Sequence, residues 1–333
     1  MNVLLLGGPK FLGRAVIDAA LERGDELTLF NRGTTNAELY PDVARLTGDR
    51  DGDLDALRGR TCDVVVDTGG YVPRVVRQSA ELLAEAAKRY VFVSSISVYA
   101  SFAGPMTEDS PVATLADPST EEVGEGTYGA LKAACEAVVE ESFPGSALHV
   151  RAGLIVGPHD PTGRFTYWPH RIARGGDVLV PGSLDRQVQL VDVRDLATWM
   201  LDTSAVGPVN VTATHTMRDV FDACVAVTGG DATPVEVDEE LLVEREVGQW
   251  MELPLWVNTA DDEWGALMRV DTSRAQAAAF AARPLEDTVR VTLERAALVD
   301  GVGLTADREA ELLAAWASTR ADMSRGQTPG GGA

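Results

Sequence analysis

The stretch that links the first predicted strand to the first predicted helix reads Leu6-Gly7-Gly8-Pro9-Lys10-Phe11-Leu12-Gly13-Arg14. Glycine at position 7 permits a tight turn, and glycine at position 13 lets a helix approach the preceding strand closely. The free N–H groups at the start of that helix attract a phosphate group. This spacing predicts a dinucleotide-binding turn made by Gly7, Gly8, Lys10, Phe11, Leu12 and Gly13, with Lys10 where the pattern often has its middle glycine.

The segments around this turn alternate between short apolar runs and longer helical patterns. We expect strands and helices at Asn2–Leu6, Gly13–Arg23, Glu26–Phe30, Val64–Asp67, Val75–Lys88, Tyr90–Ser94, Tyr128–Glu141 and Leu148–Arg151. Such alternation is typical of βαβ units, and strands that are apolar at successive positions are expected where helices cover both faces of a sheet. The sequence thus predicts an α/β fold, a Rossmann doubly wound parallel sheet, with its ligand site at the carboxyl ends of the strands.

The second half of the chain differs, because proline and tryptophan occur there in segments without a clean period. We interpret it as a smaller C-terminal substrate-binding domain. The predicted division is a dinucleotide-binding Rossmann domain at 1–157 with a return segment at 188–212, a substrate-binding domain at 158–187 and 213–320, and a disordered tail at 321–333.

The composition narrows the classes of partner. The 333 residues include 29 basic and 51 acidic side chains, a net charge of −22, so phosphate backbones and anionic membranes should repel the chain. Three widely spaced cysteines fit neither a disulfide framework nor a zinc site. No segment reads as a targeting signal or a membrane span. We expect a cytoplasmic protein with a small-molecule substrate and no nucleic-acid, membrane or metal partner; a homodimer is compatible with the sequence.

The end of the second predicted strand indicates which dinucleotide is bound. Asn31 and Arg32 stand about 20 residues after the glycine turn, where NAD-specific folds carry an acidic residue for the ribose 2′-hydroxyl. Together with Lys10 they offer neutral and cationic groups suited to a 2′-phosphate, which favours NADP(H) over NAD(H). Asp49 and Arg50 follow the third strand and complete this candidate set; Asp49 either contacts the adenine edge or closes a turn.

A tyrosine and a lysine, Tyr128 and Lys132, lie four residues apart on one predicted helix and so project from the same face. A phenol, with a pKa of about 10, is a poor base at neutral pH, but a neighbouring ammonium and an oxidised nicotinamide both favour its phenolate form. Ser95 ends a strand at the same predicted sheet edge and is suited to hydrogen-bond a substrate oxygen. The chain has only three lysines, which makes a lysine at this place informative.

With these residues in place, the sequence resembles the extended short-chain dehydrogenase/reductase family, of the NAD(P)-dependent epimerase/dehydratase type. The segments that carry the resemblance are Gly7–Gly13, Thr68–Gly70, Ser94–Ser95, Thr107–Pro111, Tyr128–Lys132 and Arg151–Pro158. The resemblance implies Tyr128 as the catalytic acid/base, Lys132 as its electrostatic and ribose-binding partner, and Ser95 as the hydroxyl that orients the substrate. The cofactor contacts that accompany it are Thr68, Gly69, Gly70, Ser94 and Gly153.

Departures from the family pattern bear on the substrate. Sugar-nucleotide dehydratases of the family carry an Asp-Glu pair after the serine position, whereas Ile96-Ser97 follow Ser95 here, which disfavours dehydration. Nucleotide-sugar epimerases usually have an asparagine three residues after the arginine that ends strand six, whereas Arg151 is followed by Ala152-Gly153-Leu154. In having lysine at position 10 of the glycine turn, the sequence is similar to the isoflavone-reductase-like branch of the family. The candidate substrate contacts are Tyr71, Ser97, Arg164, Trp168 and Arg186.

We therefore expect an NAD(P)-dependent oxidoreductase, a reductase that moves hydride between nicotinamide and a carbonyl, hydroxyl or activated double bond of a small organic substrate. One alternative is an NAD-dependent sugar or nucleotide-sugar epimerase, which returns the hydride to its substrate. A second alternative is a non-catalytic relative that senses NAD(P) or binds RNA. Retention of Ser95, Tyr128 and Lys132 speaks against a sensor, and the net charge of −22 speaks against RNA.

Overall fold

The computed structural model describes residues 1–326, with side chains through Met323. These residues form two compact units, each built from several chain segments. The first unit consists of Met1–His159, Gln189–Thr214 and Asp262–Arg283. The second consists of Asp160–Val188, His215–Asp261 and the chain from Pro284 onward. Within the described part, every helix is too short or too polar to cross a membrane.

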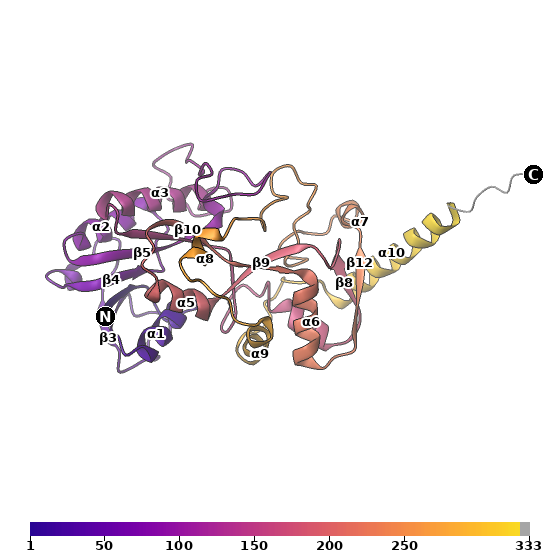
Figure 1. Cartoon of the computed structure of the whole chain (residues 1–333), viewed down its shortest axis with the longest axis horizontal. Helices are drawn as coiled ribbons and strands as arrows, with labels where there is room; N and C mark the ends of the chain where they lie inside the picture. Colours follow the sequence, from indigo (N-terminus) through magenta and orange to yellow (C-terminus); the bar gives the residue numbers. More distant parts are fainter. Residues whose placement is uncertain (327–333) are drawn as a thin grey trace, which may run out of the picture. The chain divides into compact units, whose positions relative to one another are not determined.

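A seven-stranded parallel sheet is the centre of the first unit (Figure 1). In spatial order its strands are β10 (Gly207–Val211), β6 (Ala147–Ala152), β5 (Ala87–Ser95), β4 (Cys62–Asp67), β1 (Asn2–Leu6), β2 (Glu26–Asn31) and β3 (Ala44–Thr47). The strand order reverses at the boundary between β1 and β4, and open parallel sheets bind ligands outside the carboxyl ends of the strands at such a switch point. The predicted doubly wound Rossmann fold is confirmed.

Helices cover both faces of this sheet, which explains why its strands are apolar at successive positions. One face carries α1 (Leu12–Glu22) and α5 (Val193–Asp202), and the other carries α2 (Pro73–Leu83) and α3 (Tyr128–Ser142) (Figure 1). The residues of β1 enter the two cores alternately. Val3 and Leu5 are buried on the α1–α5 side, while Leu4 and Leu6 are buried on the α2–α3 side.

One predicted helix boundary is wrong. We expected a helix over Val75–Lys88, but α2 ends at Leu83 and β5 begins at Ala87. Ala87 pairs with Cys62 of β4, so the ladder between these two strands claims residues whose own preference is helical. The strand expected at Tyr90–Ser94 is longer for the same reason, and a short 3-10 turn, η2 (Ile96–Val98), follows it.

The segment Asp262–Arg283, which we expected in the substrate-binding domain, belongs to the first unit instead. It contains α8 (Ser273–Ala277), and its residues Ala275 and Phe280 are buried in the α1–α5 core. Trp199 of α5 also donates its indole N–H to the Ala278 carbonyl at 2.9 Å. Contacts between residues far apart in sequence place this segment in the first unit, and sequence periodicity cannot reveal such contacts.

The second unit contains a two-stranded parallel sheet of β8 (Gly176–Pro181) and β12 (Ala232–Val237). Its helices are α4 (Tyr167–Ala173), α6 (Met217–Thr228), α7 (Glu239–Glu244), α9 (Leu285–Arg295) and α10 (Ala306–Gly326). The sequence fixes both ends of α6: Thr216 and Asp219 form a capping box at its start, and Gly229 ends it with a φ of 65°.

The remaining elements include a three-stranded sheet in the order β11 (Ala213–Thr216), β9 (Gln187–Asp192) and β7 (Leu154–Val156), and a 3-10 turn, η1 (Asp55–Leu57). The expected tail at 321–333 requires a correction, because residues 321–326 continue α10. Residues 327–333 lie outside the described residues.

Candidate active site

The glycine turn after β1 is packed too closely for larger residues. Gly7 has a φ of 151°, and a Cβ atom built there would lie 2.2 Å from the Thr68 hydroxyl oxygen. A Cβ on Gly13 would lie 2.2 Å from the Gly8 carbonyl oxygen, so α1 approaches the turn directly. No side chain caps the start of α1, and its first turn contains no acidic residue. The turn therefore fits a pyrophosphate held by the N–H groups at the start of this helix.

The end of β2 is tied to the glycine turn by Asn31. Its amide nitrogen donates to the Gly7 carbonyl at 3.0 Å, and its amide oxygen accepts the Gly33 N–H at 2.9 Å. Asn31 thus holds the two loops together instead of presenting a free amide. Lys10 and Arg32 are both exposed at the surface on these two loops.

Two candidate residues after β3 are engaged within the protein. The Asp49 carboxylate accepts the Asp51 N–H at 3.0 Å, as a turn-closing acid does. Arg50 donates to both carboxylate oxygens of Asp67, at 2.6 and 2.8 Å, and to the Ser79 hydroxyl at 2.8 Å. The Arg50 guanidinium is therefore paired with a buried carboxylate, and its role as a direct cofactor contact stays a prediction.

Lys132 is buried in α3, with 3% of its surface exposed. Its ammonium donates to the Gly70 carbonyl at 2.6 Å and to the Val93 carbonyl at 2.5 Å. It also lies 4.1 Å from the centre of the Phe92 ring and 5.2 Å from that of Tyr71. Burial lowers the pKa of Lys132 to about 8, because removal from water disfavours the charged form.

The first turn of α3 brings Tyr128 to the end of β5. A Cβ atom on Gly129 would lie 2.0 Å from the Ser97 carbonyl oxygen, so this turn packs directly on η2. Ser95 donates its hydroxyl to that of Ser97 at 3.0 Å and accepts the Ser97 N–H at 3.1 Å. The rings of Tyr128 and Tyr71 lie 6.4 Å apart, centre to centre. The candidate catalytic residues Ser95, Tyr128 and Lys132 thus gather near the carboxyl ends of β4 and β5.

The small residues after β4 connect this cluster to the glycine turn. The Thr68 N–H donates to the Leu6 carbonyl at 3.1 Å. Gly70 cannot be larger, because a Cβ atom there would lie 2.5 Å from the Phe92 ring. Gly69 is exposed between them. Thr68, Gly69 and Gly70 therefore line the edge that joins the predicted dinucleotide turn to Lys132.

Two of the cofactor contacts implied by the family resemblance have structural partners of their own. The Ser94 hydroxyl donates to Glu136 at 2.5 Å and is buried. Gly153 packs against Thr212, whose hydroxyl oxygen would lie 2.7 Å from an added Cβ. These contacts account for a buried serine and a glycine at the two positions without a cofactor.

The second unit holds three candidate substrate contacts in different surroundings. Trp168 is fully buried and donates to the Pro254 carbonyl at 3.1 Å, which is the environment of a core side chain rather than of a pocket wall. Arg164 lies 4.9 Å from the centre of the Trp250 ring. Arg186 donates to the Leu255 carbonyl at 2.7 Å, and burial lowers its pKa to about 10.

The sequence reasoning missed three buried residues at this site. Asp67 ends β4 with no exposed surface, and the Tyr90 hydroxyl donates to it at 2.8 Å. Phe92 lies beside the Lys132 ammonium, and Glu136 follows Lys132 by one helical turn. The spacing of Glu136 was a usable signal, since residues four apart share a helix face.

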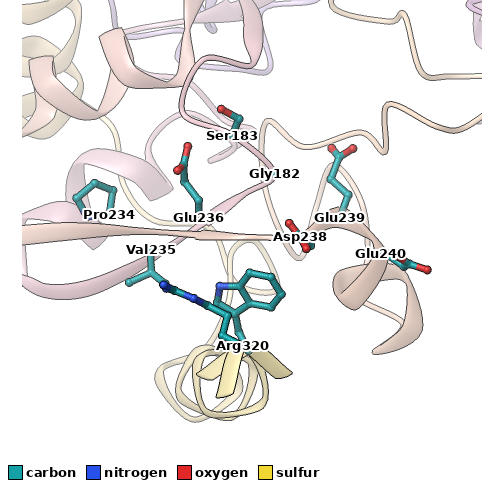
Figure 2. Close-up of a pocket in the computed structure, with 10 residues that line it drawn as sticks. Gly182, Ser183, Pro234, Val235, Glu236, Asp238, Glu239, Glu240 and Arg320 are labelled. Carbon is teal, nitrogen blue, oxygen red and sulfur yellow. The ribbon is translucent and has the colours of Figure 1, made fainter. Parts of the chain in front are cut away.

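An open hollow of about 830 Å³ lies in the second unit (Figure 2). Its lining residues are Gly182, Ser183, Pro234, Val235, Glu236, Asp238, Glu239, Glu240, Trp316 and Arg320. The Glu239 carboxylate already accepts from the Trp256 indole at 2.9 Å and from the Thr259 hydroxyl at 2.5 Å. None of the site residues predicted from the sequence is among these lining residues.

Comparison with known proteins identifies relatives of the chain. The model of the NAD dependent epimerase/dehydratase family matches residues 3–204, more than half of the chain. The chloroplast stem-loop binding protein of 41 kDa b from Arabidopsis thaliana is 28% identical over 219 residues, which are 60% of this chain and 54% of that protein. The chain thus spans about half the length of this curated relative.

Solved structures share the fold over most of the chain. UDP-glucuronic acid 4-epimerase from Bacillus cereus in complex with NAD is 15% identical, with a TM-score of 0.59, over 87% of this chain and 97% of that one. UDP-glucose 4-epimerase from Thermotoga maritima is 18% identical, with a TM-score of 0.58, over 88% and 98%. The Bordetella bronchiseptica enzyme WbmH in complex with NAD+ is 19% identical, with a TM-score of 0.61, over 88% and 98%. By its fold and its match to the family model, the chain belongs to the NAD dependent epimerase/dehydratase family.

Proposed function

We propose that the protein is an NAD(P)-dependent enzyme that moves a hydride to or from a hydroxyl-bearing carbon of a small organic substrate. The observation that carries this proposal is the fixation of the Lys132 ammonium by the Gly70 and Val93 carbonyls, one helical turn after Tyr128. That arrangement brings a buried cation near a phenol at the sheet edge where this fold binds ligands.

The residues of the first unit then have distinct roles. A bound nicotinamide dinucleotide supplies the hydride acceptor or donor. The turn Gly7–Gly13 would hold its pyrophosphate on the N–H groups of α1. The Lys132 charge favours the phenolate form of Tyr128, so that this oxygen takes the proton of the substrate hydroxyl as hydride leaves the carbon. Ser95 donates a hydrogen bond to the same substrate oxygen.

Within this chemistry, the comparisons favour an epimerase over the simple reductase that the sequence suggested. Two of the structures that share the fold are a UDP-glucuronic acid 4-epimerase and a UDP-glucose 4-epimerase. An epimerase of this kind removes a hydride from a carbon and returns it to the other face, so it consumes no dinucleotide. We therefore propose a sugar-like substrate with a free hydroxyl as the first class to examine.

Arg186 of the second unit is partly buried, and its role as a contact for an anionic group of the substrate remains a proposal. Two of its nitrogens donate to the carbonyls of Leu255 and Pro181, and the third has no hydrogen-bond partner among the described residues. A guanidinium with one nitrogen left without a hydrogen-bond partner is suited to a phosphate or a carboxylate of the ligand, and the nearby Glu239 carboxylate favours its charged form. Arg186→Gln should raise KM at least tenfold and leave kcat within about threefold. An unchanged KM would remove this residue from the site.

The reductase remains the second candidate, because the exposed cations Lys10 and Arg32 favour NADP(H). Arg32→Ala should weaken NADP+ binding about tenfold and leave NAD+ binding unchanged, as measured by calorimetric titration. Arg58→Ala is the matched control, since Arg58 is exposed and pairs only with Asp55 of η1. An equal loss of affinity for both dinucleotides would refute a 2′-phosphate contact at Arg32.

The dinucleotide that accompanies the purified protein separates the two reactions. The protein is denatured, and the released dinucleotide is identified and quantified by mass spectrometry. Stoichiometric NAD(H) supports an epimerase that keeps its cofactor. A protein that purifies empty and exchanges NADPH with NADP+ supports a reductase, and a protein that binds no dinucleotide rejects both.

A further inference from the structure

A second buried polar cluster lies on α3, next to the residues assigned to chemistry. Glu136 follows Lys132 by one helical turn and Tyr128 by two, so the three side chains share a helix face. Glu136 is 7% exposed, while Ser94 and Arg151, from β5 and β6, are each 4% exposed. The Glu136 carboxylate and the Arg151 guanidinium are therefore both buried, and Glu136 lies one helical turn from Lys132.

These side chains join three elements through one carboxylate. Arg151 donates to both oxygens of Glu136, from Nε at 3.1 Å and from Nη2 at 2.8 Å. Ser94 donates to the same carboxylate at 2.5 Å. The remaining Arg151 nitrogen donates to the Glu108 carbonyl at 3.1 Å and to the Tyr99 hydroxyl at 3.3 Å. Every polar side-chain atom of Glu136 and Arg151 thus takes part in a hydrogen bond.

Such a pair contributes little net stability, because apolar residues of similar size would fill the space at no cost of desolvation. Its planar geometry instead fixes the position of each group that it joins. Two of the three elements joined here, β5 and α3, carry the active-site cluster. Ser94 immediately precedes Ser95 at the end of β5, and Glu136 lies on the helix that carries Tyr128 and Lys132.

We infer that Glu136 is a positioning residue: together with Arg151 and Ser94 it sets the register of α3 against the carboxyl end of β5. In this way it fixes the distance between the Ser95 and Tyr128 hydroxyls. The inference rests on the proposed function. The Glu136 carboxylate also favours the charged form of Lys132, which opposes the larger effect of burial on the pKa of that lysine. A shift of about 1 Å between reacting groups is enough to cost about a hundredfold in rate.

The test replaces the charge pair by apolar side chains of similar size. The double variant Glu136→Leu/Arg151→Met removes the register contacts without leaving an unpaired buried charge. We expect it to fold, to bind the dinucleotide within about twofold of the wild type, and to lose about 10- to 100-fold in kcat with little change in KM. Glu140→Gln is the matched control, because Glu140 lies one turn further along α3, is half exposed, and contacts His149 and the Gly145 N–H instead of the Arg151 cluster. It should leave kcat unchanged.

A second readout does not depend on turnover. In protein labelled with 13C-lysine the three lysines give three Cε signals, and Lys132→Met identifies the signal of Lys132. The Phe92 ring, 4.1 Å from the Lys132 ammonium, makes this signal sensitive to the position of α3. We expect it to move in the double variant and not in Glu140→Gln. A folded double variant with wild-type kcat or an unmoved Lys132 signal would overturn the inference.

If the double variant does not fold, Ser94→Ala decides the question, because it leaves the Glu136–Arg151 pair intact. We expect about a threefold to tenfold loss in kcat and a displaced Lys132 signal, and wild-type values for both would reject the positioning role. A wild-type protein that binds no dinucleotide would instead reject the proposed function. The Lys132 signal would still report whether the cluster sets the register, so the two failures are distinguishable.

Discussion

At the scale of single residues, the proposed chemistry depends most on the Tyr128 hydroxyl. Tyr128→Phe keeps the ring that lies 6.4 Å from Tyr71 and removes only the hydroxyl group, which carries the transferable proton. We expect kcat to fall by about a thousandfold and the dinucleotide dissociation constant to stay within about twofold, as measured by steady-state kinetics and calorimetry. Tyr40→Phe is the control, since its hydroxyl bonds Asp18 outside the cluster. Wild-type turnover in Tyr128→Phe would reject the acid/base assignment.

Lys132 gives a prediction for the pH dependence of stability. Its pKa is 10.5 as an ordinary lysine and about 8 when buried in the folded protein. Between these values the unfolded chain binds more protons than the folded one, so this residue makes the free energy of unfolding rise with pH. Relative to Lys132→Met, the stability of the wild type should increase by about 3 kcal/mol over this window.

Urea unfolding of both proteins at a series of pH values from about 7 to 10.5 measures this difference, since titrations of other groups cancel between them. The Lys132→Met variant also lacks the hydrogen bonds to Gly70 and Val93, but that loss does not depend on pH. A stability difference that stays constant across the series would show that Lys132 is not desolvated in the folded state.

Residue patterns were sufficient to predict those candidate residues that follow a short local rule. The four-residue spacing of Tyr128 and Lys132 and the strand end at Ser95 were found without the structure. The ion pair of Arg50 could not be predicted in this way, because its partner Asp67 is 17 residues away and comes near it only when β3 and β4 take their places in the sheet.

At the scale of elements, the contact between α3 and η2 determines where Tyr128 lies. Gly129→Ala would put a Cβ atom 2.0 Å from the Ser97 carbonyl oxygen, and a backbone atom cannot yield locally as a flexible side chain does. We expect the helix to shift and kcat to fall at least tenfold. Gly126→Ala, three residues earlier, is the matched control, since nothing lies within 4 Å of its added Cβ. Equal kcat values for the two variants would contradict this packing.

Elements were predictable where local pattern and tertiary contact agree. The strand, glycine turn and helix at Asn2–Glu22 were placed from the sequence because apolar runs and turn residues coincide there. The end of α2 was not, because Ala84–Lys88 has good helical preference and only its pairing with β4 makes part of it a strand. The placement of Asp262–Arg283 in the first unit likewise depends on contacts between residues far apart in sequence, such as the hydrogen bond from Trp199 to Ala278.

At the scale of the whole molecule, the net charge predicts that the protein has no nucleic-acid partner. The curated relative from Arabidopsis thaliana is named as a stem-loop binding protein, whereas this chain carries a net charge of −22. We expect no change in the fluorescence anisotropy of a labelled hairpin RNA up to about 10 μM protein at about 150 mM salt. Binding that weakens steeply as salt increases would show a local basic surface that overrides the net charge.

The most direct test of the central claim is calorimetric titration of the cofactor-stripped protein with NADP+, NADPH, NAD+ and NADH. This titration tests whether the turn Gly7–Gly13 and the cluster around Lys132 form one nicotinamide dinucleotide site. We predict one equivalent of bound dinucleotide, and tighter binding of the NADP forms would support the reductase with a 2′-phosphate contact at Lys10 and Arg32. Tighter binding of the NAD forms would keep the site and remove the 2′-phosphate contact. No binding of any of the four would contradict the claim itself.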